Sequence, residues 1–128
     1  MTREIYKSDS IGSSGPYSQA VKAGEFVYFS GQTAMNGVDA KAETHLGSIT
    51  EQTEIVFENL QKVMDAAGVT EDEVVKANVF ITSMDYFAEM NAVYGEFFSA
   101  PYPARTCVAV RELPLGTDVE IEIIARRK

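Results

Sequence analysis

The chain has 128 residues, 45% of them hydrophobic and 23% charged, with a net charge of -8 and an isoelectric point near 4.6. This length predicts one folded domain, residues 1–128, that buries roughly two thirds of the surface exposed by the unfolded chain. The negative charge and the scattered basic residues disfavour nucleic acid as a partner, because phosphate binding needs clustered Lys and Arg.

The composition also predicts the compartment. The chain has one cysteine, Cys107, so it cannot carry an internal disulfide framework, and a reducing environment fits best. The N-terminal stretch MTREIYKSDS lacks the apolar core of a signal peptide, and no apolar run approaches the length of a membrane span. We therefore expect a cytoplasmic protein that has no membrane partner.

The first half of the chain predicts one strand and one helix. Residues 25–31, EFVYFSG, are rich in β-forming types and bounded by glycine, which is typical of a strand. The polar stretch 36–47 predicts a surface loop. Ser48 and Glu51 then form a capping box that begins a helix, and Gly68 is placed to end it. The apolar face of this helix comprises Val56, Phe57, Leu60, Val63, Met64 and Ala67.

The second half predicts three strands and another helix. Residues 70–73 can form one capped turn, and 74–82 alternate as in a half-buried strand. A helix from about 85 to 99 is stopped by two prolines, and strands at 104–110 and 119–126 flank a turn rich in Pro and Gly. The expected inward side chains are Val75, Ala77, Val79 and Ile81 on the first strand, and Phe87, Met90, Asn91, Tyr94, Phe97 and Phe98 on the helix.

These elements predict an α+β fold in which two helices form one layer on a sheet. Two helices cover only one face of such a sheet. The opposite face needs another partner, and a second subunit is the simplest candidate.

Few catalytic repertoires fit the sequence. The one histidine, His45, falls in the polar loop and reads as a solvated residue, and no Cys/His cluster suggests a zinc site. The sequence also lacks a P-loop, a nucleophile elbow and a dinucleotide fingerprint. We therefore expect no metal and no cofactor, which leaves cofactor-free chemistry or none.

The stretch PYPARTCVAV (101–110) contains the most informative residue. It reads as a buried strand, yet Arg105 near its start cannot lose its proton and is costly to bury unpaired. Arg105 must lie at a rim, pair with a carboxylate or await an anion. Alternation along 119–126 places Glu120 off the core face of a strand expected to neighbour that of Arg105. The two could bind an acid and handle a water, or form an ordinary cross-strand ion pair.

Six segments of this chain, in order, resemble the RidA (YjgF) family of reactive intermediate deaminases. They are SSGPYSQAV (13–21), FVYFSGQ (26–32), QTEIVFENLQKVMDAAGV (52–69), VVKANVFITSMDYFAEMNAVYGEFF (74–98), PARTCVAVRELP (103–114) and VEIEIIA (119–125). The resemblance implies a chorismate-mutase-like fold, in which one mixed sheet packs against two helices. It also implies a homotrimer with clefts between subunits.

The resemblance further implies hydrolysis of 2-imino or enamine acids, such as 2-iminopropanoate and 2-iminobutanoate, to 2-oxo acids and ammonia. By matching position, Arg105 would clamp the substrate carboxylate in a bidentate geometry that lysine cannot reproduce. Glu120 would orient the attacking water. Cys107 and Gly31 would contribute mainly through their backbones, and Tyr17 would close the site from a neighbouring subunit.

The resemblance adds two supporting residues, Ser30 and Asn91. The sequence also departs from the family at two places. Ser13-Ser14 stands where an apolar residue is usual, which affects the expected preference for the substrate side chain, and Ala34 stands where proline is more usual.

A different class of function stays open, because residues sufficient for catalysis also suffice for a non-catalytic regulator or interaction protein that binds 2-oxo acids. Ribonuclease activity is disfavoured by the net charge of -8.

Overall fold

The structure of the protein is a computed structural model that describes residues 2–12, 15–35 and 47–127. One six-stranded sheet has the order β1-β2-β3-β6-β4-β5. The strands are β1 (Glu4–Tyr6), β2 (Ala20–Ala23), β3 (Phe26–Phe29), β4 (Val74–Ile81), β5 (Ala104–Ala109) and β6 (Val119–Arg126). The described helices are α1 (Ile49–Ala67), α2 (Phe87–Phe97) and short 3-10 helices at Glu71–Glu73, Met84–Tyr86 and Pro114–Gly116.

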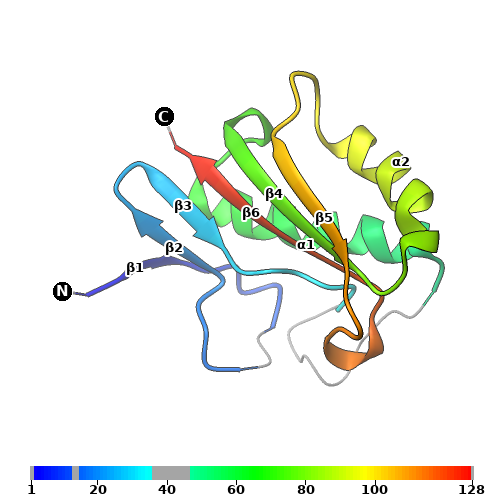
Figure 1. Cartoon of the computed structure of the whole chain (residues 1–128). Helices are drawn as coiled ribbons and strands as arrows, with labels where there is room; N and C mark the ends of the chain where they lie inside the picture. The colour runs from blue at the N-terminus through cyan, green and yellow to red at the C-terminus, as the bar shows by residue number, and fades with distance from the viewer. Residues whose placement is uncertain (1, 13–14, 36–46, 128) are drawn as a thin grey trace.

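The sheet is mixed, and both α-helices lie on one of its faces (Figure 1). β4 and β5 are parallel because α2 carries the chain back between them, whereas the other neighbouring strands are antiparallel. This arrangement confirms the predicted two-layer α+β fold.

α1 begins and ends as its sequence predicts. The Ser48 hydroxyl accepts a hydrogen bond from the Glu51 amide, and the Glu51 carboxylate accepts one from the Ser48 amide, both at 3.1 Å. At the other end Gly68 adopts φ 69°, a left-handed conformation that glycine takes without steric cost. All six residues of the predicted apolar face are buried.

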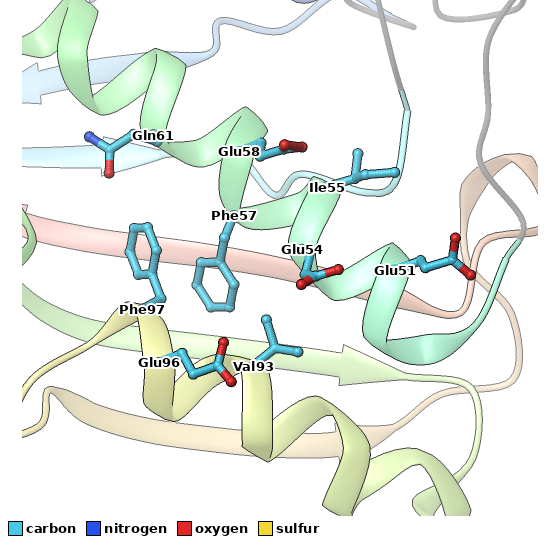
Figure 2. A pocket seen from close by; sticks show the side chains of 9 residues that line it. All are labelled: Glu51, Glu54, Ile55, Phe57, Glu58, Gln61, Val93, Glu96 and Phe97. Atoms are coloured by element: carbon cyan, nitrogen blue, oxygen red, sulfur yellow. The ribbon is translucent and has the colours of Figure 1, made fainter.

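Aromatic side chains join α1 to α2. The rings of Phe57 and Phe97 stack with centroids 4.3 Å apart, and Phe98 meets Phe57 edge-on at 5.8 Å. Figure 2 shows Phe57 and Phe97 facing each other from the two helices. α2 is therefore held to α1 as well as to the sheet, which fixes the helix that carries Asn91.

Two predicted elements differ from the structure. Val75 was predicted to face the core, but a register shift between Val74 and Lys76 turns Val74 inward and leaves Val75 42% exposed. The predicted helix 85–99 is shorter, because the Ser83 hydroxyl caps a 3-10 turn and Phe98 is already extended at the other end. The inward set on α2 is otherwise correct, since its aromatic residues and Met90 are buried or pack against the core.

Other differences lie near the N-terminus. The predicted strand 25–31 is shorter than expected, and β1 and β2, which precede it in the chain, were not predicted. β1 contributes only three residues, and β2 is too short for its alternation to be recognised. Residues 36–46 of the expected loop, His45 among them, lie outside the described residues.

The sheet face opposite the helices carries exposed apolar side chains. Phe26 and Tyr28 alternate with buried residues on β3 and are 36% and 48% exposed, and Val108 on β5 is 41% exposed. Exposed apolar groups on one face are typical of a protein–protein interface. This is the face on which the sequence predicts a second subunit, and that partner stays a prediction.

Candidate active site

The candidate site residues fall into two groups on opposite faces of the sheet. Arg105 pairs in register with Ala77, which is buried under the helices, so Arg105 points to the helix face. Glu120 is on β6, where it lies opposite Phe80 of β4 and alternates with the buried Val119 and Ile121. Its side chain therefore points to the other face of the sheet. β4 lies between their strands, so the expectation that these strands are neighbours is wrong.

The first group surrounds the Arg105 guanidinium. Its Nη1 donates a 2.6 Å hydrogen bond to Oδ1 of Asn91 on α2. The guanidinium carbon lies 4.7 Å from the ring centroid of Tyr94 and 5.6 Å from that of Phe87. Among the described residues no ion pair joins Arg105 to a carboxylate. Arg105 is thus held by an amide and two aromatic rings, with donors left for an anion.

Phe87 and Tyr94 were predicted only as core residues. They lie four residues before and three residues after Asn91, on the same face of α2, so helix periodicity could have shown that they accompany it. The Tyr94 hydroxyl is buried and has no hydrogen-bond partner in the described part of the chain. Burial raises the pKa of Tyr94, although the nearby charge of Arg105 opposes this, so the hydroxyl stays neutral.

Cys107 belongs to this first group. It lies two residues after Arg105 on β5, in register with the buried Val79, and therefore shares the helix face. Burial raises the pKa of the thiol, and the Arg105 charge only partly offsets this. The thiol therefore stays protonated at neutral pH, which is unfavourable for a nucleophile.

The second group lines a cavity of about 310 Å³ on the opposite face. Tyr17, Ser30, Gly31 and Glu120 all contribute to its wall. The Ser30 hydroxyl donates a 2.6 Å hydrogen bond to the Ser18 carbonyl, which ties the segment carrying Tyr17 to the end of β3. The supporting role of Ser30 in the site stays a prediction.

Gly31 lies close against the side chain of Glu120. Backbone hydrogen bonds of 2.9 and 3.1 Å between Gln32 and Ile121 hold the chain after β3 against β6. A Cβ atom on Gly31 would lie only 2.5 Å from Oε2 of Glu120, and two further Glu120 atoms would lie at 3.0 Å. The absent side chain is what allows the carboxylate to occupy the cavity wall.

The carboxylate of Glu120 is electrostatically unusual. Burial, and secondarily the charge of nearby Glu122, raises the pKa of Glu120 above its ordinary 4.5. A carboxylate with a raised pKa is a stronger base than an exposed one, which suits a group that accepts a proton from water.

A larger groove of about 660 Å³ lies between α1 and α2 (Figure 2). It contains none of the predicted site residues. Its wall carries no cation but four carboxylates, those of Glu51, Glu54, Glu58 and Glu96. An anionic substrate would be repelled there, so the groove is a poor candidate for binding an acid.

Comparison with known proteins identifies the family. The model of the endoribonuclease L-PSP family, which is the RidA/YjgF family, matches residues 7–127. The chain belongs to the RidA family. It is 44% identical over 110 residues to a 2-iminobutanoate/2-iminopropanoate deaminase of Dermatophagoides farinae, covering 86% of this chain and 84% of that protein.

Solved RidA-family structures share the whole fold. RidA of an Antarctic Psychrobacter species is 41% identical, with a TM-score of 0.87 over 97% of this chain and 99% of that one. Escherichia coli TdcF, solved with bound serine, is 33% identical, with a TM-score of 0.87 over 98% of this chain and 99% of that one. A member of the family therefore binds a small amino acid.

Two physical exclusions apply to the described residues. Neither α-helix is long and apolar enough to cross a membrane. Within residues 2–12, 15–35 and 47–127, no three His, Cys, Asp or Glu side chains are grouped to hold a metal ion. The predicted cytoplasmic location stays a prediction.

Proposed function

We propose that this RidA-family protein is a cofactor-independent deaminase that hydrolyses 2-imino acids, such as 2-iminopropanoate and 2-iminobutanoate, to 2-oxo acids and ammonia. The observation that carries the proposal is the separation of an anion-binding group around Arg105 from a basic group around Glu120. Each group is half of a site for an acid that reacts with water. The relative named as a deaminase of these substrates, at 44% identity, supports the same reaction.

The two halves meet between copies of the chain. Arg105 lies on the edge strand β5, and the cavity with Glu120 opens on the sheet face that the helices leave uncovered. Two different patches that complement each other form a head-to-tail contact, which closes into a ring when the rotation between copies allows it. A homotrimer with three sites is the ring that we propose, and Tyr17 closes each site from the Glu120 side.

Each residue then has a role in one reaction. Arg105 of one copy binds the substrate carboxylate through two N–H donors, oriented by Asn91. On the neighbouring copy, Glu120 takes a proton from a water as the water oxygen bonds to C2 of the protonated imine, and the electron pair of the C=N double bond moves to the positively charged nitrogen. The product of this step is a neutral carbinolamine.

Collapse of the carbinolamine completes the reaction. Protonated Glu120 gives its proton to the amine, the C2–N bond breaks with its electron pair on nitrogen, and the C2 hydroxyl gives its proton to the departing ammonia as the carbonyl forms. The products are the 2-oxo acid and ammonium, and Glu120 is again ionised. The cavity contributes chiefly by orienting substrate and water, an effect that can lower a barrier by several kcal/mol.

A coupled assay tests this function. A pyridoxal-phosphate dehydratase generates 2-iminopropanoate from serine, and the decay of the imine signal is followed with and without this protein. We expect faster decay with the wild type, none above background with Arg105→Ala, and a severe loss with Arg105→Lys, which keeps the charge but not the bidentate geometry. Serine or 2-oxo acid binding without faster decay would instead identify a non-catalytic regulator.

The family description also names an endoribonuclease. Ribonuclease activity can be tested with the same purified protein. Three of the described cations are already paired with carboxylates: Lys7 with Asp9, Lys22 with Glu4, and Arg126 with Glu25. This pairing favours a small acid over a polyanion as substrate. Cleavage of single-stranded RNA that Arg105→Ala abolishes would favour the endoribonuclease.

A further inference from the structure

Leu115 combines three features that are each unfavourable locally. It lies in the short turn between β5 and β6, its side chain is 42% exposed, and its backbone has φ 60° and ψ 22°. A left-handed conformation is strained for a residue with a Cβ, and exposing a large apolar side chain forgoes its burial. Such residues persist where their position serves a site.

The turn that carries Leu115 is firmly anchored. Thr117 is buried, with 1% of its surface exposed, and its hydroxyl donates a 2.8 Å hydrogen bond to the Pro114 carbonyl. The Thr117 amide donates to the same carbonyl at 3.3 Å. These bonds close the turn around Leu115, so the strained conformation is held by a buried residue.

Leu115 lines the same cavity as Glu120. The wall of that cavity includes two carboxylates, Glu120 and Glu122, and three residues with apolar or aromatic side chains, Leu115, Pro114 and Tyr17. A substrate carboxylate is repelled by the two glutamates and must point out of the cavity. With C2 held near Glu120, these three residues are the part of the wall suited to the substrate side chain.

We propose that Leu115 is a specificity-determining residue that favours 2-imino acids with a straight aliphatic side chain longer than methyl. This inference rests on the proposed function, because it takes the cavity beside Glu120 as the place where C2 lies. Each additional methylene is buried against Leu115, and its exposed surface is available for that contact. The cavity volume of about 310 Å³ is at the lower end of the range for ligand sites, which suits a short chain.

Calorimetric binding of 2-oxo acids tests the inference without requiring turnover. Pyruvate, 2-oxobutanoate and 2-oxohexanoate are titrated into the wild-type assembly, and affinity is expected to rise two- to fourfold per methylene. In Leu115→Ala this dependence should largely disappear, while affinity for pyruvate stays within about threefold. Rates of imine hydrolysis for the same side chains should follow the same order.

Two variants guard against a merely structural effect. Val75→Ala truncates a side chain that is also 42% exposed but lies near the start of β4, outside the cavity that Leu115 lines. This variant should keep the wild-type dependence of affinity on chain length. Leu115→Gly should raise the melting temperature, because glycine adopts φ 60° freely, and yet lose the dependence as Leu115→Ala does. Lost selectivity in a more stable protein cannot come from unfolding.

The outcomes separate the two proposals. Binding that depends on chain length through Leu115, without imine hydrolysis, would support the apolar wall and refute the deaminase. Imine hydrolysis with the same dependence on chain length in Leu115→Ala and wild type would keep the deaminase and overturn the role of Leu115. Wild-type affinity that does not rise from pyruvate to 2-oxohexanoate would also overturn it.

Discussion

Arg105 and Glu120 lie on opposite faces of one sheet, with β4 between their strands. These two residues are the strongest candidates for binding and catalysis. The fold of a single chain does not direct them into a common cleft. This separation argues against the ordinary cross-strand ion pair, since Arg105 contacts Asn91 and two aromatic rings rather than Glu120. A site that uses both residues, as we propose, would therefore have to combine more than one copy of the chain.

The fit between Gly31 and Glu120 gives a prediction with a matched control. Gly31→Ala places a methyl group 2.5 Å from Oε2 of Glu120 and must displace the carboxylate, so we expect a loss of about 10²-fold in kcat/KM. Gly95→Ala, on α2, meets nothing within 4 Å and should stabilise the helix by about 1 kcal/mol. Imine decay rates and thermal melts measure both. Full activity in Gly31→Ala would show that the position of Glu120 is unimportant.

Asn91 is predicted to position the Arg105 guanidinium. Asn91→Ala removes the 2.6 Å hydrogen bond, so KM should rise about tenfold while kcat changes less than about threefold. Asn91→Asp would pair with Arg105 and compete with the substrate carboxylate, so its KM should rise further. Steady-state kinetics with a range of imine concentrations separate these effects. An Asn91→Asp variant with the wild-type KM would contradict the role.

Cys107 is predicted to act without its thiol. Burial raises the thiol pKa, and water can attack C2 directly, so Cys107→Ser should keep most of the wild-type rate. Initial rates of imine decay for Cys107→Ser, beside Glu120→Ala, measure the contrast. A dead Cys107→Ser together with a fully active Glu120→Ala would indicate covalent thiol catalysis.

The raised pKa of Glu120 predicts a linked effect on rate and stability. As the base, Glu120 must be ionised, so the acid limb of kcat/KM should lie above the ordinary value of 4.5, and Glu122→Gln should move it down by removing a like charge. Protonation of the substrate affects the wild type and Glu122→Gln equally, so the difference between their pH profiles reports on Glu120. Identical acid limbs would contradict the assignment.

The stability effect has a definite sign. Because the folded-state pKa is raised, the folded protein binds more protons than the unfolded chain, and stability falls as pH rises from 4.5 through the raised value. Glu120→Gln does not titrate, so its melting temperature should exceed that of the wild type by more at pH 7 than at pH 4. An advantage that is larger at pH 4 would reverse the sign.

The sequence was sufficient to predict the layers but not the strand order. The capping box at Ser48 and Glu51, and the alternation along β6, are local patterns, and both are confirmed. The pairing of β6 with β4 is a long-range choice that periodicity does not encode, so the strands of Arg105 and Glu120 were wrongly expected to be neighbours. The outward turn of Val75 depends on a bulge, which shifts a two-residue period without a composition signal.

The candidate site was predictable to a similar extent. The chemistry of an arginine at the start of an apolar strand drew attention to Arg105, and strand alternation drew attention to Glu120. The family resemblance supplied Tyr17 and the roles expected of all three residues. The aromatic support from Tyr94 could have been found from helix spacing. Leu115 could not, because its importance comes from a backbone angle and a shared cavity.

Mixed assemblies test most directly whether the site forms between copies. Arg105→Ala and Glu120→Ala chains, each inactive alone, are co-expressed with different tags, and assemblies containing both are purified. If one copy supplies Arg105 and its neighbour Glu120, every trimer that contains both chains has one intact site of its three, so imine hydrolysis should return to about a third of the wild-type rate. Mixed assemblies that are as inactive as their parents would contradict a site shared between subunits.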